Sequence, residues 1–358
     1  MISIVLGTRP EIIKMAPVIR ACQCTGTVFS VLHTGQHYSY DMDRIFFEEL
    51  ELPRPDYNLD IGSGTHAEQT GRIMAGVEQI FLKDAPDIVL VQGDTNTVMA
   101  AALAAAKLHI PVGHVEAGLR SFDRRMPEEI NRVVTDHIAD ILFAPTNLSR
   151  DHLLHEGIDA KKIHVTGNTV VDAVYQNREI AQKRTKILNE LGLTQNKYLL
   201  ATAHRAENVD VKEHLQYIIS ALSSLAEKYA MPVIFPMHPR TQKMLRDFQI
   251  PSPGITILQP VGYLEFLELE AHAALVLTDS GGLQEESCIL KVPCVTLREN
   301  TERPETIDVG ANVLAGTHPA TIVTAAVKMM DIDRTWDNPY GDGTAGERIV
   351  GICNDVMI

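Results

Sequence analysis

Short runs of aliphatic and β-branched residues alternate with longer stretches of helical periodicity along the whole chain. In the first half, the strand-like runs cover residues 2–6, 28–33, 88–91, 112–115, 141–144 and 163–165. Most of the segments between them, such as residues 9–21, 66–82, 97–108 and 128–138, space their apolar side chains as a helix does. Strands that alternate with helices predict parallel sheets covered on both faces.

The second half of the chain repeats this rhythm. Strands are expected at residues 198–201, 233–236, 255–258, 275–278 and 294–297, and helices at 211–229, 263–272 and 283–290. Two such series in 358 residues predict an α/β protein of two doubly wound, Rossmann-like domains that face a central cleft. We expect the first domain to span residues 1–168 and the second to span 169–344, with the tail 345–358 as a candidate to pack back on the first.

Composition narrows the possible functions. Apolar residues make up 45% of the chain and charged residues 22%, as in ordinary globular proteins. The net charge of −14 argues against a general binder of nucleic acid or of anionic membranes. We see no signal peptide and no apolar run of the roughly 18–20 residues that a membrane span needs. The five cysteines are an odd number without zinc-ligand spacing, so we expect a reduced, cytoplasmic protein with no metal.

Ligands of parallel α/β sheets bind beyond the carboxyl ends of the strands, so the residues that follow each strand are candidates for chemistry. After the first strand, Gly7 allows a tight turn into a helix whose start is flanked by Arg9 and Lys14. Such a helix start favours an anion, although a plain turn with solvated basic residues explains the motif equally well. The motif is not GxGxxG, which counts against a nicotinamide enzyme.

Three carboxylates follow elements of the first domain. Asp94 comes just after the strand 88–91, and Glu116 just after the strand 112–115. Glu128 stands at the start of another helix. Separately, Asp94 could be a helix N-cap and Glu128 a favourable first-turn residue. Together in one crevice they would raise each other's pKa, which suits proton transfer.

The second domain offers a nucleotide site. Its strongest signal is the run 278–286, in which Ser280, Gly281 and Gly282 join a strand to a helix and would let backbone N–H groups approach a diphosphate. Glu286 lies about one helical turn further on, within reach of ribose hydroxyls. His204 and Arg303 also follow strands and would contact phosphate, or else form a surface turn and a salt bridge.

Six motifs in family order resemble the non-hydrolysing UDP-N-acetylglucosamine 2-epimerases. They are residues 7–11 (GTRPE), 93–95 (GDT), 114–120 (HVEAGLR), 127–129 (PEE), 279–286 (DSGGLQEE) and 301–305 (TERPE). The resemblance implies a glycosyltransferase-B-like fold and a homodimer. It also implies interconversion of UDP-N-acetylglucosamine and UDP-N-acetylmannosamine for polysaccharide biosynthesis, with no cofactor and no metal.

The resemblance also implies a role for each matching residue. In the first domain, Arg9 and Lys14 match residues near the diphosphate and sugar, and the catalytic carboxylates are matched by Asp94, Glu116 and Glu128. In the second domain, His204 matches the active-site histidine and Phe266 matches a neighbour of the uracil. The phosphate loop is matched by Ser280, Gly281 and Gly282, while Glu286 matches the ribose partner and Arg303 matches a phosphate ligand. The chain departs from some relatives at Val261 and in residues 35–41. Activation by a second substrate molecule, near Gln36, Arg72, Arg205 and His238, is left open.

The chemistry of the sugar constrains the mechanism. Its C2 proton is not next to a carbonyl, so loss of UDP from C1 must first make it acidic. The implied path is elimination to 2-acetamidoglucal and UDP, followed by re-addition with the proton delivered to the opposite face. A retaining glycosyltransferase, a hydrolysing epimerase and a non-catalytic nucleotide-sugar sensor are the alternatives, and which carboxylate serves which face stays open.

Overall fold

The computed structural model describes residues 1–36 and 40–357, which form two compact units. Unit 1 comprises Met1–Gln176 and Tyr340–Ile358, and unit 2 comprises Asn177–Pro339. The chain first leaves unit 1 inside the continuous helix α7 (Thr169–Arg184), where no loop marks a boundary. The sequence predicts this boundary at 168/169 and the return at 344/345. The roles assigned to the two domains stay predictions.

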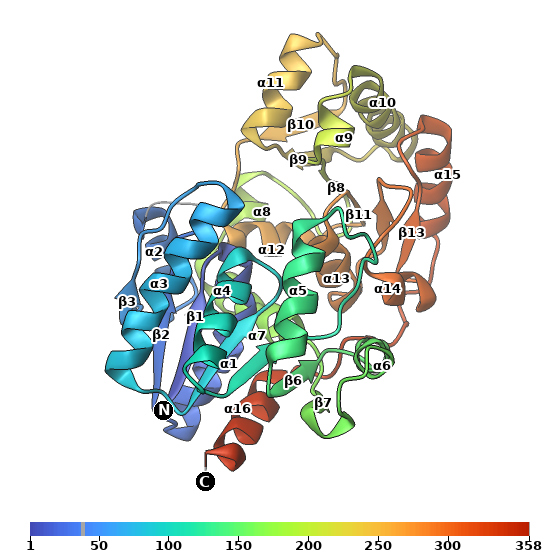
Figure 1. The fold of residues 1–358 in the computed structure, drawn as a ribbon. Helices are drawn as coiled ribbons and strands as arrows, with labels where there is room; N and C mark the ends of the chain where they lie inside the picture. The colour runs from blue at the N-terminus through green and yellow to red at the C-terminus, as the bar shows by residue number, and fades with distance from the viewer. Residues whose placement is uncertain (37–39, 358) are drawn as a thin grey trace. The chain divides into compact units, whose positions relative to one another are not determined.

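Unit 1 contains a parallel sheet with the strand order β3-β2-β1-β4-β5-β6-β7 (Figure 1). Its strands are β1 (Ile2–Leu6), β2 (Phe29–His33), β3 (Tyr57–Asn58), β4 (Ile88–Gln92), β5 (Val112–Val115), β6 (Ile141–Ala144) and β7 (Ile163–Val165). The chain runs outward in one direction from β1 and in the other from β4. The carboxyl ends of β1 and β4 therefore flank the topological switch point, where doubly wound sheets bind ligands.

Helices cover both faces of this sheet. They are α1 (Arg9–Thr25), α2 (Tyr40–Glu49), α3 (His66–Asp84), α4 (Asn96–Lys107), α5 (Pro127–Ile138), α6 (Asn147–His155) and α16 (Ala345–Val356), with a short 3₁₀ turn at Ala160–Lys162. The alanine-rich α4 packs between α3 and α5. The C-terminal α16 packs against α1, and a side chain at Gly346 would collide with the backbone of Pro17.

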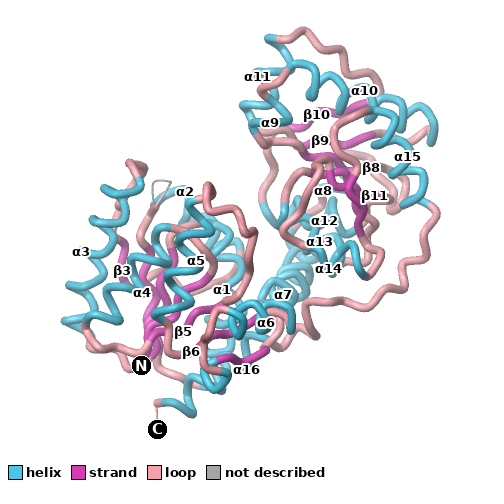
Figure 2. The backbone as a smooth tube through the Cα atoms, turned by 45° about the vertical axis from the view of Figure 1, so that its right-hand side comes forward, coloured by secondary structure: helices cyan, strands magenta, loops and turns pink. Residues whose placement is uncertain are grey.

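Unit 2 is a second doubly wound domain, with the strand order β10-β9-β8-β11-β12-β13 (Figure 2). Its strands are β8 (Leu199–Thr202), β9 (Val233–Pro236), β10 (Ile255–Leu258), β11 (Leu275–Thr278), β12 (Cys294–Thr296) and β13 (Asn312–Leu314). Its helices are α8 (Ile187–Glu190), α9 (Ala206–Val209), α10 (Lys212–Tyr229), α11 (Pro239–Asp247), α12 (Tyr263–Ala271), α13 (Gly281–Ile289), α14 (Pro304–Asp308) and α15 (Pro319–Met330). Here the switch point lies between β8 and β11.

Alternate residues of the strands supply separate hydrophobic cores on the two faces of the unit 2 sheet. In β8, Leu199 and Ala201 belong to one buried cluster, while Leu200 and the preceding Tyr198 belong to the other. This alternation follows from the two-residue repeat of a strand. Every strand pair in both sheets is parallel, which confirms the predicted doubly wound architecture. Over the described residues, none of the helices has the length and apolar character needed to cross a bilayer.

Candidate active site

Lys14 and Glu116, both predicted site residues, meet in unit 1. Glu116 directly follows β5 with a φ of +69°, in the left-handed region that residues other than glycine rarely adopt. Its side chain is 4% exposed, and its two carboxylate oxygens accept hydrogen bonds of 2.8 and 2.7 Å from Lys14 Nζ. Gln92, the last residue of β4, also donates to this carboxylate. Together these bonds hold a charged pair beyond the ends of two neighbouring strands.

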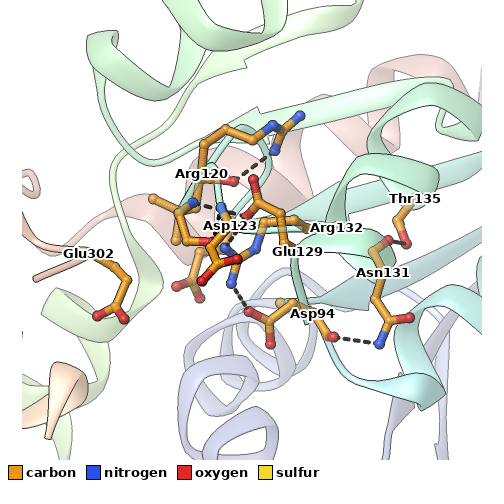
Figure 3. A network of polar contacts seen from close by, with 12 residues as sticks. Asp94, Arg120, Asp123, Glu129, Asn131, Arg132, Thr135 and Glu302 are labelled. Carbon is orange, nitrogen blue, oxygen red and sulfur yellow. Dashed lines mark hydrogen bonds and ion pairs between the residues drawn. The ribbon is translucent and has the colours of Figure 1, made fainter. Parts of the chain in front are cut away.

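Asp94 lies beyond the end of β4 and is held by two residues of α5 (Figure 3). The Arg132 guanidinium pairs with its carboxylate, and Asn131 Nδ2 donates to its backbone carbonyl at 2.9 Å. A second arm of the guanidinium donates to Glu129 Oε2 at 2.7 Å. The Asp94 carboxylate is about one-third exposed (34%), so it is oriented by Arg132 and still open to a ligand.

The neighbours Glu128 and Glu129 have different surroundings. Glu129 is buried, and its carboxylate accepts hydrogen bonds of 2.9–3.0 Å from Ser121 and from the Phe122 backbone N–H. Glu128, the predicted catalytic residue, is exposed in the first turn of α5. The structure thus links Asp94 to Glu129 through Arg132, and a catalytic role for Glu128 stays a prediction.

Glu11 is a buried carboxyl that joins the loops after β1 and β4. It accepts hydrogen bonds from the backbone of Gly7 and Thr8, and from Thr95 Oγ1 at 2.6 Å. Burial, with a smaller contribution from the nearby charge of Asp94, raises the pKa of Glu11 to about 7 against the opposing effect of these bonds. Glu11 therefore couples the predicted anion-binding turn to the loop that carries Asp94.

Arg9 and Gln36 belong to the same edge of unit 1. The Arg9 guanidinium lies 4.8 Å from the centre of the Phe46 ring, a cation–π contact with α2. Gln36 Oε1 accepts hydrogen bonds from the backbone N–H of Thr97 at 3.1 Å and from its hydroxyl at 2.7 Å. Residues 37–39 of the divergent segment 35–41 lie outside the described residues.

In unit 2, His204 and Asp279 follow the adjacent strands β8 and β11. Asp279 is fully buried, and one of its oxygens lies 2.8 Å from His204 Nδ1. It also accepts from the backbone N–H groups of His204 and Arg205 and from Asn208 Nδ2, at 2.9–3.2 Å. Burial alone would raise the pKa of Asp279, but the hydrogen bond and charge of His204 and the other donors lower it. The ionised Asp279 thus orients His204, whose side chain is 51% exposed.

The loop of Ser280, Gly281 and Gly282 begins helix α13. Ser280 is the N-cap, and its side chain makes no capping hydrogen bond. A Cβ at Gly281 would meet nothing closer than 3.8 Å, and one at Gly282 nothing closer than 4.0 Å. Neither glycine has a φ in the left-handed region. The fold itself therefore does not require glycine here, and the open space leaves the helix N-terminus accessible, as the predicted phosphate loop needs.

Glu286 and Phe266 lie on neighbouring helices of unit 2. The Tyr263 hydroxyl donates to Glu286 Oε1 at 3.4 Å. Beside them, the fully buried Glu270 accepts from Ser287 Oγ at 2.8 Å. Burial, and then the charge of Glu286, raise the pKa of Glu270 well above its usual value. Phe266 on α12 is half-buried against the core of this face.

Arg303 is already paired within unit 2. Its Nε lies 2.7 Å from Oε1 of Glu285, whose side chain is 1% exposed. The adjoining residue Glu302 pairs at 2.9 Å with Arg298, and Gln284 accepts a hydrogen bond of 2.6 Å from Thr301. The loop that carries Arg303 is therefore fixed to α13, on which the glycine turn lies.

A model of the family described as UDP-N-acetylglucosamine 2-epimerase matches residues 21–354. The chain belongs to this family. The UDP-N-acetylglucosamine 2-epimerase of Methanococcus maripaludis is 57% identical over 358 residues, which cover 98% of this chain and 97% of that protein. A crystal structure of the Methanocaldococcus jannaschii UDP-GlcNAc 2-epimerase in complex with UDP-GlcNAc and UDP has a TM-score of 0.89. It is 56% identical, and 99% of each chain is covered. These epimerase relatives confirm the predicted glycosyltransferase-B-like fold.

One relative of this chain is named for a different substrate. The UDP-2,3-diacetamido-2,3-dideoxy-D-glucuronate 2-epimerase of Pseudomonas aeruginosa is 44% identical over 350 residues, which cover 96% of this chain and 97% of that protein. Family membership therefore shows the kind of enzyme, an isomerase, and leaves the substituents of the sugar to be tested. No cluster of metal-ligating side chains occurs within residues 1–36 and 40–357.

Sequence reasoning missed the residues that hold the predicted epimerase site in place. Arg132, Gln92 and Asp279 each contact a predicted residue directly. Asp279 and Gln92 stand at strand ends, so the rule used for the other candidates would have found them. Arg132 is three residues beyond Glu129 on α5, a spacing that places the two on one helix face.

Proposed function

We propose that this protein interconverts UDP-N-acetylglucosamine and UDP-N-acetylmannosamine by inversion at C2. The observation that carries the proposal is the pair of carboxylates, Asp94 and Glu116, just beyond the ends of the adjacent strands β4 and β5. Each is held by a cation, Arg132 or Lys14. The M. maripaludis relative, 57% identical, is named for this activity.

Unit 2 supplies the predicted nucleotide site. The open helix N-terminus at Gly281 and Gly282 would bind the diphosphate, and Glu286 would accept hydrogen bonds from the ribose. Asp279 binds Nδ1 of His204, so Nε2 is the nitrogen left to donate to a phosphate oxygen. Phe266 would lie beside the uracil. The carboxylates of unit 1 then act on the sugar.

The reaction proceeds in two steps, an elimination and then an addition that delivers the proton to the opposite face of C2. In the first, the C1–O bond breaks and its electron pair leaves with UDP, while a carboxylate removes the C2 proton to give 2-acetamidoglucal. In the second, UDP re-adds at C1 and a carboxylic acid delivers a proton to the opposite face of C2. Lys14 and Arg132 keep the carboxylates oriented, and His204 and the glycine turn stabilise the departing diphosphate.

Deuterium uptake at C2 tests this proposal. In D2O, NMR should show UDP-N-acetylglucosamine converting to UDP-N-acetylmannosamine, with deuterium entering C2 of both because the carboxylates exchange protons with solvent between the steps. A glycosyltransferase would leave the C2 proton in place, a hydrolysing epimerase would accumulate UDP, and a sensor would return the substrate unchanged. A parallel assay with UDP-2,3-diacetamido-2,3-dideoxy-D-glucuronate compares the two substrates named for the relatives.

Arg303→Ala should weaken UDP binding about 10- to 100-fold, because a charge-assisted hydrogen bond contributes about 1.5–3 kcal/mol. The change also leaves the buried Glu285 carboxylate without its ion pair to Arg303, so calorimetry of UDP binding is paired with a thermal melt. Arg303→Lys keeps a positive charge there and should lose less. Arg334→Ala, which removes an arginine bonded to Asn196 and the Ala274 carbonyl, is the control. Unchanged UDP affinity in folded Arg303→Ala would assign Arg303 to the ion pair alone.

The homodimer, the cytoplasmic location and the link to polysaccharide synthesis stay predictions. Sedimentation of the purified chain would establish its oligomeric state.

A further inference from the structure

His114 is a buried histidine whose two ring nitrogens are both hydrogen bonded. It lies in the middle of β5, and its side chain is completely buried. Nδ1 lies 2.6 Å from Asp136 Oδ1, and Nε2 lies 2.8 Å from the carbonyl oxygen of Gly93. Neither the predicted catalytic residues nor the nucleotide site includes this histidine.

The hydrogen-bond partners decide which protons the ring carries. The Gly93 carbonyl can only accept, so Nε2–H must donate to it. Asp136 is ionised: burial would raise its pKa, but the charges and hydrogen bonds of His114 and Arg120 lower it. Nδ1 lies within hydrogen-bond distance of this carboxyl, so His114 is held by the backbone at one nitrogen and by Asp136 at the other.

The contact between His114 and Asp136 joins the two loops that carry the predicted carboxylates. Gly93 directly precedes Asp94, so the Nε2 hydrogen bond fixes the peptide that orients it. At the other end, Asp136 Oδ2 accepts from the backbone N–H of Gly118 at 3.2 Å, two residues after Glu116. Both glycines have φ values above +80°, in turns that depend on such contacts.

Asp136 is itself held in place by charged neighbours. Asp136 Oδ2 lies 2.7 Å from Arg120 Nη1, and this guanidinium binds both oxygens of Glu156 at 2.7 Å. A Cβ at Gly118 would collide with the backbone carbonyl of Ser149, so the loop has no room to shift toward α6. The series of polar contacts that runs from Gly93 through His114, Asp136 and Arg120 to Glu156 is thus continuous and tightly packed.

We propose that His114 and Asp136 are positioning residues for the epimerisation, which set the separation of Asp94 and Glu116 by holding the Gly93 carbonyl and the Gly118 amide at once. This inference rests on the proposed function, because it assigns the two carboxylates to proton transfer.

Four variants test the proposal by separating turnover from binding. His114→Gln removes the ring, so the side chain cannot contact Asp136 and the Gly93 carbonyl at once. Asp136→Ala removes the carboxylate that contacts both His114 and the Gly118 N–H. Both should lower kcat about 10- to 100-fold, since a shift of about 1 Å can cost that much. KM for the nucleotide sugar and the Kd of UDP should stay within about twofold. Asp136→Asn should retain most of the turnover, because its amide can donate to Nδ1 of a neutral ring while its oxygen still accepts from Gly118. Val77→Ala, a core residue on α3, serves as a control with lowered stability and normal kcat.

NMR of ¹⁵N-histidine-labelled wild-type protein reads the ring directly. The signal absent from His114→Gln should show a proton on Nε2, as the hydrogen bond to the Gly93 carbonyl requires, and this measurement stands even where Asp136→Ala does not fold. A ring without a proton on Nε2, normal kcat in folded His114→Gln, or equal losses in Asp136→Asn and Asp136→Ala would each overturn the inference. So would an equal loss of kcat in Val77→Ala at matched Tm. Wild-type protein that epimerises nothing would instead defeat the proposed function.

Discussion

Replacing Asp94 by Asn should slow the turnover of UDP-N-acetylglucosamine about 10²- to 10⁴-fold, the usual loss when a general acid or base is removed. Asparagine has nearly the same shape, and its oxygen can still accept from Arg132, so the surroundings of residue 94 should persist. It cannot take up or deliver a proton. UDP affinity should change little, because the residues predicted to bind the nucleotide belong to unit 2.

The measurements are an NMR time course for kcat and calorimetry for UDP. Asp123→Asn is a matched control, since Asp123 pairs with Arg125 on an exposed loop of the same unit. Turnover close to that of wild type in Asp94→Asn would remove Asp94 from the proton transfer. Glu116→Gln provides the companion result, with the added loss of its ion pair to Lys14.

Asp279→Ala should lower the free energy of unfolding by about 3–5 kcal/mol, the typical cost of breaking a buried charged pair. The substitution leaves several donors of His204, Arg205 and Asn208 without their acceptor in a buried place. The pKa of Asp279 is lowered in the folded protein. Its stabilisation should therefore be present above the unfolded pKa of about 3.9 and disappear as pH falls through the folded value.

Urea denaturation at pH 7 and at low pH measures this effect. Asp210→Ala is the control, because Asp210 forms an exposed pair with Arg240 that should contribute no more than about 1 kcal/mol. The difference in stability between wild type and Asp279→Ala should shrink as pH falls. An unfolding midpoint equal to that of the wild type at pH 7 would show that water satisfies the donors.

The architecture could be predicted because it depends on local patterns. Ile2–Leu6, for example, is a fully buried segment that is apolar except for Ser3, as expected of a strand covered on both faces. The two-residue strand β3 was missed, since Tyr57–Asn58 is too short to show any periodicity. The first boundary between the units was also hidden, because it lies inside the helix α7.

The candidate site was predictable to the extent that its residues follow strands. Four of them follow strands: Asp94, Glu116, His204 and Ser280. Because the strands of each unit are parallel, the candidates within one unit lie at the same edge of its sheet. Their partners come from elsewhere in the fold. Arg132 reaches Asp94 from α5, a contact set by the packing of that helix and by no neighbouring sequence. The same holds for the different surroundings of Glu128 and Glu129, since adjacent residues point about 100° apart around a helix.

The packing of α16 on α1 has a consequence for the order in which the protein is made. Unit 2 is contiguous from Asn177 to Pro339, so the ribosome delivers all of it before α16 exists. The part of α1 around Pro17 that α16 covers stays open to solvent during this time. Unit 2 can therefore finish folding first, although unit 1 is started earlier. Closure of unit 1 by α16 then comes after all of unit 2 has been synthesised, so no nascent chain carries both completed units before α16 has emerged.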